Sequence, residues 1–319
     1  MKPTLGKSNY LDRLPWQTIY SNLLKNKPLM PNKNLNFDNI AIAVHPLNRE
    51  AYSLAEEIGA FLKIMGKNVQ MGKMDEPDLR EGISNGSQDL LIALGGDGTM
   101  LRAGHIAAIS STPILGINLG SFGFLTEIQR DEWSSALDRV MIGDFRLEKR
   151  MMLQSTLLRD GKECGSWTAL NDAVISRGET IRPIQLIIEI NNRHLSTIVA
   201  DAVIASTATG STAYAMAAGG PILSPELRNV ILVPVAPHLS IEQSLVLSEN
   251  VCIAIIINTS HQAVISIDGQ SAVSLVNEDR IEIKASDHAA SFIRFHDPGY
   301  FYRNLIPYMD QNPTIKKNV

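Results

Sequence analysis

A buried apolar segment that ends in a glycine-rich turn constrains this chain more than any other stretch. Residues 90–94 read Leu-Leu-Ile-Ala-Leu, and residues 95–99 read Gly-Gly-Asp-Gly-Thr. The apolar run predicts a buried strand, and the pattern from Met100 onward predicts a helix. A strand, turn and helix of this kind commonly build a phosphate site, because glycines let the backbone approach a ligand closely. The lone carboxylate of Asp97 can orient a metal ion there or accept a proton.

This pentapeptide is neither of the two best-known phosphate loops. It lacks the Gly-Lys-Ser/Thr ending of the P-loop and the glycine spacing of the dinucleotide fingerprint. A tight structural bend therefore stays an alternative, although the strand before the turn and the helix after it favour a ligand site. Arg102, one turn into the helix, either reaches back to a phosphate as a forked donor or lies in solvent.

Strand and helix patterns alternate through the first half of the chain. A buried strand is predicted at residues 40–44, and further strands at residues 68–71 and 113–118. Apolar residues fall on one helical face between residues 54 and 65, and again between 133 and 141, whereas residues 75–83 show no defined pattern. Such alternation predicts an α/β domain with a mostly parallel sheet and a ligand crevice at the carboxyl ends of the strands.

Short strands and turns replace this alternation after about Phe145. Asp160-Gly161 and Asn191-Asn192 are hairpin signals, and apolar residues alternate between them over residues 184–190. Further strands are expected at residues 251–257, 263–267 and 280–283, and a helix only at 212–218. The second half therefore predicts a mainly antiparallel β domain.

The two ends of the chain differ from these domains. Residues 1–37 are polar and contain four prolines, which predicts an N-terminal extension with a short amphipathic helix over residues 12–24. From Ser291 to residue 319 an aromatic-rich tail is expected to pack as a helix on the N-terminal domain.

Composition excludes several classes of protein. Lys and Arg number 29 against 33 Asp and Glu, a net charge of −4, whereas nucleic-acid binders normally carry a basic patch. Only Cys164 and Cys252 are present, which argues against a disulfide framework and fits a reducing compartment. No apolar run is long enough to cross a membrane, and the N-terminus lacks a signal core. We therefore expect a cytoplasmic protein with neither a nucleic-acid nor a membrane partner.

Two polar segments in the second half are further candidates for a ligand site. Asn171 and Asp172 interrupt an apolar run, and buried polar groups are costly unless paired, so they either satisfy a backbone bulge or face a ligand. Residues 206–212 form a Ser/Thr/Gly turn between a predicted strand and a predicted helix, and such a turn offers hydroxyl and N–H groups. Tyr214 either presents its ring to a base or sugar or packs in the core.

Together these motifs resemble the NAD kinase family. The pentapeptide at 95–99 matches the family signature, and the sequence Thr-Gly-Ser-Thr-Ala-Tyr at 209–214 and the Asn-Asp pair at 171–172 make the resemblance specific. The other matching blocks, in family order, are Gly116–Leu125, Arg150–Leu153, Gly219–Ile222, Pro237-His238 and Asp268–Gln270. The resemblance covers about residues 39–310.

The resemblance implies a Rossmann-like α/β domain over residues 38–145 and a β-sandwich over residues 146–290, with NAD between them. It implies a kinase that transfers the γ-phosphoryl group of ATP, or of another donor, to the 2′-hydroxyl of the adenosine ribose of NAD and forms NADP. Mg²⁺ or another divalent cation would accompany ATP, with no metal ligand assigned to the protein. The enzyme would be a homo-oligomer, a dimer or a tetramer.

The same resemblance implies roles for particular residues. Asp97 would accept the hydroxyl proton and contact NAD, Asn171 and Asp172 would hold its adenosine part, and Asp201 would contact the nicotinamide end. Gly95, Gly96, Gly98 and Thr99 would form the phosphate loop. The further residues expected to bind NAD are Gly98, Arg102, Arg182, Thr212, Ala213, Tyr214, Ala215, Met216, Ala217 and Gln270.

Three positions depart from the family pattern. Ala208 replaces a usual proline, Leu119 an often polar or basic residue, and Val199 a common basic residue, and the segment after His238 is shorter. These departures bear on affinity and on the preference between NAD and NADH more than on reaction type. Two other hypotheses stay open: a lipid kinase with the same turn, which would need an apolar lipid pocket, and a nucleotide sensor, which would lose Asp97 at little cost to binding.

Overall fold

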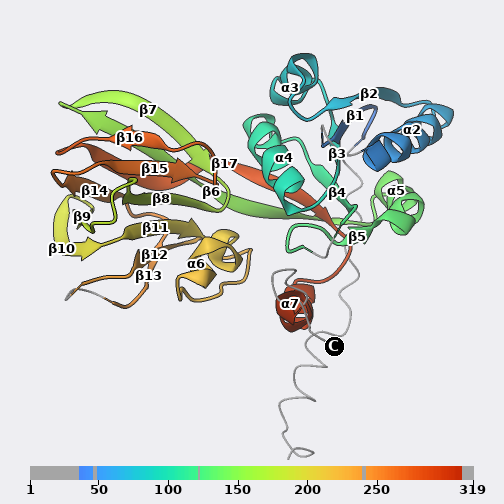
Figure 1. The fold of residues 1–319 in the computed structure, drawn as a ribbon. Coiled ribbons are helices and arrows are strands. Elements are labelled where there is room, and N and C mark those ends of the chain that lie inside the picture. Colours follow the sequence, from blue (N-terminus) through green and yellow to red (C-terminus); the bar gives the residue numbers. More distant parts are fainter. Residues whose placement is uncertain (1–35, 46–48, 121–122, 239–241, 311–319) are drawn as a thin grey trace, which may run out of the picture.

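The N-terminal half forms a parallel sheet in the computed structural model, which describes residues 36–45, 49–120, 123–238 and 242–310 (Figure 1). The sheet runs in the order β2 (Asn68–Lys73), β1 (Asn39–Val44), β3 (Leu90–Leu94), β4 (Ile114–Asn118) and β5 (Ile128–Gln129). Every residue of β3 and β4 is buried, as continuous apolar runs predict for parallel strands covered on both faces. The helix expected at residues 12–24 lies outside the described residues.

Alternate residues of these strands face two layers of helices. Ile40 and Ile42 pack with α2 (Arg49–Ile64) and α5 (Trp133–Met141). Ala41 and Ala43 pack with α3 (Pro77–Ser84) and α4 (Asp97–Ser110) on the opposite face. In Figure 1, α4 lies on the side that faces the second half of the chain.

Helix α3 corrects the expectation that residues 75–83 lack a defined structure. Its two buried residues, Leu79 and Ile83, are four apart and form a single short apolar face. The helix begins at Pro77, whose fixed φ suits the first helical turn. Two apolar positions in eight residues were too few to reveal the helical period in the sequence.

The second half of the chain is a sandwich of two antiparallel layers. One sheet contains β13 (Leu245–Ser248), β12 (Asn229–Val235), β11 (Ala202–Thr207), β8 (Asp172–Arg177), β15 (Ala263–Ile267) and β16 (Val273–Leu275). The facing layer contains β10 (Arg193–Ala200), β9 (Ile184–Ile190), β14 (Ile253–Asn258), β17 (Arg280–Arg294), β6 (Arg146–Arg159) and β7 (Lys162–Ala169). One apolar core joins both layers, so the predicted fold class is confirmed.

The long strands β6 and β17 connect the sandwich with the parallel sheet (Figure 1). Phe292 of β17 pairs in parallel with Ile114 of β4, so one sheet continues through both halves. The expectation of a helix from Ser291 was wrong at its start, because α7 spans only Tyr300–Asp310. A register shift between Ala285 and Ala289 interrupts the alternation, which hid the far end of β17 in the sequence.

The two predicted hairpin turns are confirmed by their backbone angles. Asp160 and Gly161 have φ values of 52° and 74°, and Asn191 and Asn192 have values of 51° and 61°. Positive φ at both central residues is the geometry that short hairpins prefer. Among the described residues, no helix has the length and apolar character needed to cross a membrane.

Candidate active site

The glycine-rich turn carries the chain from β3 directly into α4. Gly95 has a φ of 157°, and its N–H donates to the carbonyl of Ile117 at the end of β4. A Cβ built on Gly95 would overlap the buried side chain of Thr99, so only glycine fits there. Asp97 is the first residue of α4, where the positive end of the helix dipole lies.

Two backbone donors orient the carboxylate of Asp97. The N–H of Phe124 donates to Oδ2 at 2.9 Å, and the N–H of Leu125 donates to Oδ1 at 3.1 Å. A Cβ built on Gly123 would overlap the same carboxylate, so glycine is required for this close approach. Each carboxylate oxygen has a second lone pair, which leaves Asp97 able to accept a further proton or hydrogen bond.

A cavity of about 730 Å³ opens beside the first turn of α4. Its volume lies within the range of about 300–1,000 Å³ that is typical of small-molecule sites. It lies at the carboxyl ends of β1 and β2, as the topology predicts, and the turn after β15 closes the other side. The residues that line it are His45, Met74, Asp75, Arg80, Gly98, Leu101, Arg102, His105, Ile106, Asp268, Gly269 and Gln270.

The carboxylate of Asp268 connects this cavity with the Asn-Asp segment. It accepts hydrogen bonds from the N–H groups of Leu170 (2.7 Å), Asn171 (2.8 Å) and Asp172 (2.8 Å). It also lies 2.7 Å from Nε2 of His105 on α4, and its own side chain is fully buried. The φ of Asp268 is 48°, a strained value that these four contacts stabilise.

Asp172 differs from an ordinary surface carboxyl in its protonation. Its side chain is buried at the start of β8, near Asp268. Burial, together with a smaller repulsion from the Asp268 carboxylate, raises the pKa of Asp172 to about 7. The group therefore changes between a hydrogen-bond donor and a charged acceptor near neutral pH.

The Ser/Thr/Gly turn packs directly on the Asn-Asp segment. Thr207 donates from its hydroxyl to the carbonyl of Leu170 (2.6 Å) and from its N–H to the carbonyl of Asn171 (2.8 Å). A Cβ built on Gly210 would overlap the same Asn171 carbonyl oxygen. The expected helix over residues 212–218 is shorter than predicted, with a 3-10 turn at Gly210–Thr212 and one α-helical turn, α6, at Tyr214–Ala217.

The side chains of this turn divide between core and solvent. Ala215 is buried in a small apolar cluster, and Met216 is half-buried. Tyr214 is 47% exposed, so the alternative that placed it in the core is wrong. Ala217 is exposed, and Thr212 and Ala213 are half-buried.

Three of the predicted site residues line the large cavity, others lie on segments that contact its lining, and two lie elsewhere. Gly98, Arg102 and Gln270 line the large cavity, and the other segments meet them through Asp268. Asp201 lies at the opposite end of β11 from Thr207, about 20 Å away at about 3.3 Å per strand residue. Its Oδ1 is 3.1 Å from Nε of Arg177. Arg182 is exposed in the loop between β8 and β9 and does not line this cavity.

Sequence reasoning missed four polar residues that line the cavity. His105 lies on the helical face of Gly98 and Arg102, seven and three residues further on, so the helical period could have found it. His45 directly follows β1, and the carboxyl ends of parallel strands mark the crevice. Asp75 and Arg80 lie in the segment whose helix was not recognised.

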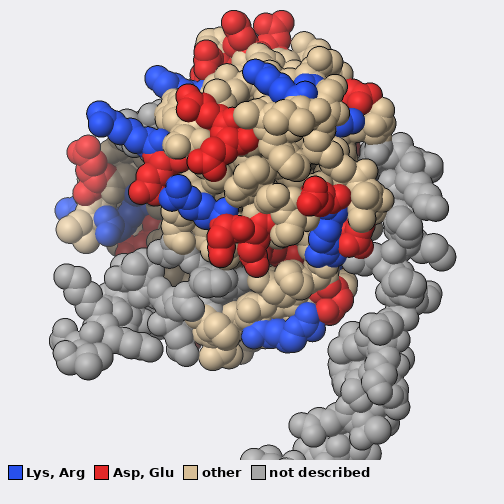
Figure 2. All heavy atoms as spheres, turned by 90° about the vertical axis from the view of Figure 1, so that its right-hand side faces the viewer, with Lys and Arg blue, Asp and Glu red and all other residues tan. Residues whose placement is uncertain are grey.

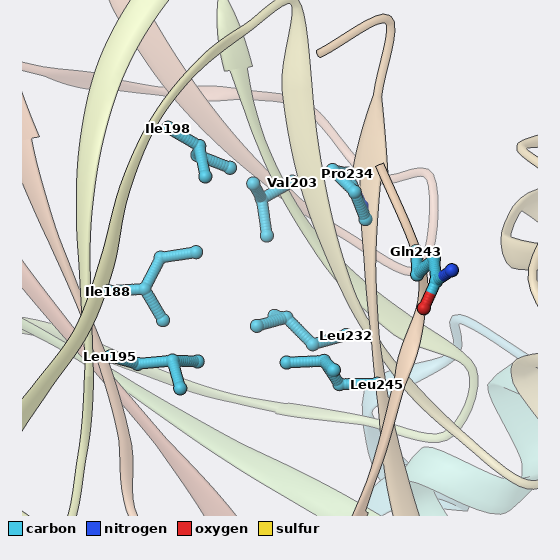
Figure 3. Close-up of a pocket in the computed structure, with 8 residues that line it drawn as sticks. All are labelled: Ile188, Leu195, Ile198, Val203, Leu232, Pro234, Gln243 and Leu245. Atoms are coloured by element: carbon cyan, nitrogen blue, oxygen red, sulfur yellow. The ribbon is translucent and has the colours of Figure 1, made fainter. Parts of the chain in front are cut away.

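Other features of the molecule offer less for a nucleotide. A gap inside the sandwich measures only about 10 Å³ and is lined almost wholly by apolar side chains such as Ile188 and Leu232, so it is a packing defect (Figure 3). Acidic and basic side chains are mixed over the face drawn in Figure 2, so the charges seen there do not form a patch of one sign. No group of three or more His, Cys, Asp or Glu residues within the described part of the chain is placed to hold a metal ion.

Fold and cavity together define an α/β protein with a cavity of small-molecule size at the carboxyl ends of its parallel strands. Two family models match the chain: the ATP-NAD kinase N-terminal domain at residues 75–145 and the ATP-NAD kinase C-terminal domain at residues 170–295. The chain belongs to the NAD kinase family.

Curated relatives agree over most of the chain. The NAD kinase of Dehalococcoides mccartyi is 36% identical over 271 residues, which cover 84% of this chain and 95% of that protein. The NAD kinase of Heliobacterium modesticaldum is 39% identical over 226 residues, which cover 70% of this chain and 79% of that protein.

Solved structures agree on the fold. An NAD kinase from Archaeoglobus fulgidus in complex with ATP matches with a TM-score of 0.68 and 26% identity, over 86% of this chain and 99% of that one. Yeast NADH kinase complexed with NADH matches with a TM-score of 0.73, over 89% of this chain and 91% of that one. At 24% sequence identity, this second likeness shows a shared fold and nothing more.

Proposed function

We propose that this protein is an NAD kinase, which transfers the γ-phosphoryl group of ATP to the 2′-hydroxyl of the adenosine ribose of NAD and forms NADP. The observation that carries the proposal is the position of Asp97, an oriented carboxylate at the start of α4 next to a nucleotide-sized cavity. Phosphoryl transfer depends on positioning and charge neutralisation more than on covalent help from the protein.

In the proposed reaction, Asp97 accepts the proton of the attacking ribose hydroxyl. The N–H groups of Phe124 and Leu125 hold its carboxylate in one orientation, so an oxygen lone pair faces the substrate without reorganisation. Arg102 lies on the cavity side of α4 and supplies a forked donor for phosphate oxygens. The backbone N–H groups and the helix dipole at the start of α4 add a second anion-binding feature.

The adenosine part of NAD is proposed to lie against the segments that Asp268 holds together. Asn171 and Asp172 lie there on backbone that Asp268 orients, and Tyr214 presents an exposed ring of the kind on which a base or sugar packs. Gln270 lines the same cavity from the turn after β15. Roles for Arg182 and Asp201 in NAD binding stay predictions, since neither lines this cavity nor lies on the segments that Asp268 holds together.

Several further properties are proposed on weaker support. A divalent cation, Mg²⁺ or a similar ion, would arrive bound to ATP, because hard cations prefer phosphate oxygens and the described residues form no ligand cluster of their own. Cys164 and Cys252 are unpaired, which fits a cytoplasmic location. A homo-oligomer, dimer or tetramer, follows from the family resemblance.

The division into domains is likewise a proposal. Residues 38–145 hold the parallel sheet and its helices, and residues 146–290 hold most of the sandwich. The tail from residue 291 would belong with the first domain, since Ile293 and Phe295 are buried in the core beneath α2 and α5.

The test is an assay of the purified full chain with NAD, ATP and Mg²⁺, followed by detection of NADP with an NADP-specific dehydrogenase. NADP should form in proportion to enzyme and time, and omission of ATP should abolish it. Parallel reactions with NADH and with polyphosphate establish the acceptor and donor range. Folded protein that forms neither NADP nor NADPH with any of these donors would overturn the proposal.

A further inference from the structure

A buried ionic network lies behind the loop that holds Asp97. Glu148 of β6 accepts hydrogen bonds from Nε of Arg150 (2.7 Å) and Nε of Arg294 (2.9 Å) on one oxygen, and from Nη2 of Arg146 (3.0 Å) on the other. The side chains of Glu148, Arg150 and Arg294 are at most 5% exposed. Removing charges from water costs several kcal/mol per ion, so burial of this network is not accounted for by general stability.

One end of the network reaches the proposed proton acceptor. Nη1 of Arg294 donates to the carbonyl of Leu125 (2.9 Å), and the N–H of Leu125 donates to Oδ1 of Asp97 (3.1 Å). Leu125 is therefore held at both its carbonyl and its N–H, so Arg294 and Asp97 bond to opposite sides of the same residue. Burial lowers the pKa of Arg294, but the neighbouring carboxylates, chiefly Glu148, raise it above its ordinary value, which keeps the guanidinium charged.

The other end reaches the turn that is proposed to bind NAD. Nη1 of Arg150 lies 3.4 Å from Oγ1 of Thr209, whose carbonyl accepts a hydrogen bond from the hydroxyl of Thr212 (3.3 Å). Arg150 and Arg294 also lie over the same ring, that of Phe292, at 5.9 and 5.1 Å from its centroid. Burial lowers the pKa of Arg150 to about 10 against the opposing effect of Glu148, so it is still protonated at neutral pH.

Helix α7 separates this network from solvent. Tyr300 and Phe301 line a gap of only about 20 Å³ beside the arginines, and the rings of Phe301 and Phe124 are 6.3 Å apart. Charge pairs are stronger where water is excluded. The same helix therefore covers both the network and the loop residue that donates to Asp97.

We propose that Arg294, Glu148 and Arg150 form a positioning network that holds two separate parts of the site in place: the loop that orients Asp97, and the NAD-binding turn at Thr209. Arg294 acts through Leu125, Arg150 acts through Thr209, and Glu148 joins the two arginines. The inference rests on the proposed function, because it assigns these residues to two parts of the same phosphoryl transfer.

Lysine cannot replace either arginine in this arrangement. Arg294 uses Nε for Glu148 and Nη1 for Leu125, and Arg150 uses the same two types of nitrogen for Glu148 and Thr209. An ammonium group is a compact point charge and cannot span two acceptors in the fixed fork of a guanidinium. Arginine-to-lysine variants therefore keep the charge and remove one positioning contact each.

The test compares Arg294→Lys and Arg150→Lys in the full chain by kcat, by the pH dependence of kcat, and by calorimetric NAD affinity without ATP. Arg294→Lys should lower kcat by about tenfold or more and change its pH dependence, with NAD affinity within about twofold. Arg150→Lys should weaken NAD binding by about fivefold or more, with kcat within about threefold. A residue that serves stability alone would not separate the two parameters.

Two more variants complete the design. Arg130→Lys, in an exposed pair with Glu50, is the matched control and should change neither parameter. Glu127→Gln weakens a longer ion pair, in which Oε1 of Glu127 lies 3.8 Å from Nε of Arg294. This variant tests the positioning role of Arg294 if Arg294→Lys fails to fold. It should lower kcat by about twofold to fivefold at unchanged NAD affinity.

Four results would each overturn one of the two proposals. Folded Arg294→Lys with wild-type kcat and pH dependence overturns the network, as does the same loss of kcat and of NAD affinity in both arginine variants. If Arg294→Lys does not fold, unchanged kcat in Glu127→Gln overturns it. Wild-type protein that forms no NADP overturns the proposed function itself, and with it the roles assigned to the network.

Discussion

The imidazole of His105 on α4 reaches the carboxylate of Asp268 in the sandwich, with 2.7 Å between Nε2 and Oδ2. An ionised carboxylate only accepts hydrogen bonds, so Nε2 of His105 is the donor. The contact joins the helix that begins with Asp97 to the turn that orients Asn171 and Asp172. This contact is thus one of those that hold the two halves of the proposed site in register, beside the packing of Leu170 against α4.

Replacement of His105 by alanine should weaken this register. Asp268 would keep its three backbone donors but lose its side-chain donor, and we expect the free energy of unfolding to fall by about 1–3 kcal/mol. Ile109→Ala, at a 57% exposed position of the same helix, should change it by less than about 0.5 kcal/mol. Urea denaturation of both variants is the measurement, and wild-type stability in His105→Ala would contradict the contact.

Asp97→Asn should remove most turnover. An amide cannot accept the ribose proton, and loss of a general base typically costs about 10²–10⁴-fold in rate. NAD affinity and the circular dichroism spectrum should change little. Asp78→Asn, at an exposed position on α3, is the matched control and should keep the wild-type rate. Near-normal kcat in Asp97→Asn would show that another group accepts the proton.

Gly123→Ala tests the orientation of the same carboxylate without changing its chemistry. The new Cβ would overlap Oδ1 of Asp97, so either the carboxylate or the loop must move, and kcat should fall by about tenfold to 100-fold. A Cβ at Gly120 meets no atom of the described residues within 4 Å, and Gly120→Ala should have a much smaller effect. Steady-state kinetics on both variants decides the matter, and equal rates would argue against a fixed carboxylate.

Tyr214→Ala should separate ligand binding from folding. The ring is 47% exposed, so its removal should change the free energy of unfolding by no more than about 0.5–1 kcal/mol. If NAD packs on the ring, KM for NAD should rise by about fivefold or more, which corresponds to about 1 kcal/mol of stacking. Tyr302→Ala, 61% exposed on α7, is the control. An unchanged KM in Tyr214→Ala would remove Tyr214 from the site.

The sequence predicted those features whose signal is local. Continuous apolar runs identified β3 and β4 because parallel strands are buried on both faces, and glycine spacing identified the turn at Asp97 because close approach requires it. The helix over residues 77–84 was missed because two apolar positions do not define a period.

Long-range contacts carried no comparable signal. Asp268 lies 98 residues from Leu170 in sequence, and Arg294 lies 169 residues from Leu125, so only the fold reveals that each of these charged side chains bonds to the backbone of that leucine. Asp201 was grouped with the site by family resemblance, yet β11 separates it from Thr207 by its whole length.

Asp172 should make stability depend on pH in an unusual direction. Its pKa is about 7 in the folded protein against 3.8 ordinarily, so between these values the folded state binds more protons than the unfolded state. Stability is then lost as pH rises through this interval, and by pH 8 the full penalty for a buried charge is present. Acidic groups with lowered pKa values act in the opposite direction.

Asp172→Asn should remove this penalty. The difference in unfolding free energy between the variant and the wild type should shift in favour of the variant by on the order of 2–3 kcal/mol from pH 5 to pH 8. The shift amounts to about 1.4 kcal/mol per pH unit up to the folded pKa. Urea denaturation at both pH values measures this difference. Asp78→Asn is the control, and its difference from the wild type should not show the same shift between the two pH values. The same variant should bind NAD more weakly, because Asp172 would hold the substrate at a cost in stability. A constant difference between Asp172→Asn and wild type across this range would show that Asp172 titrates normally.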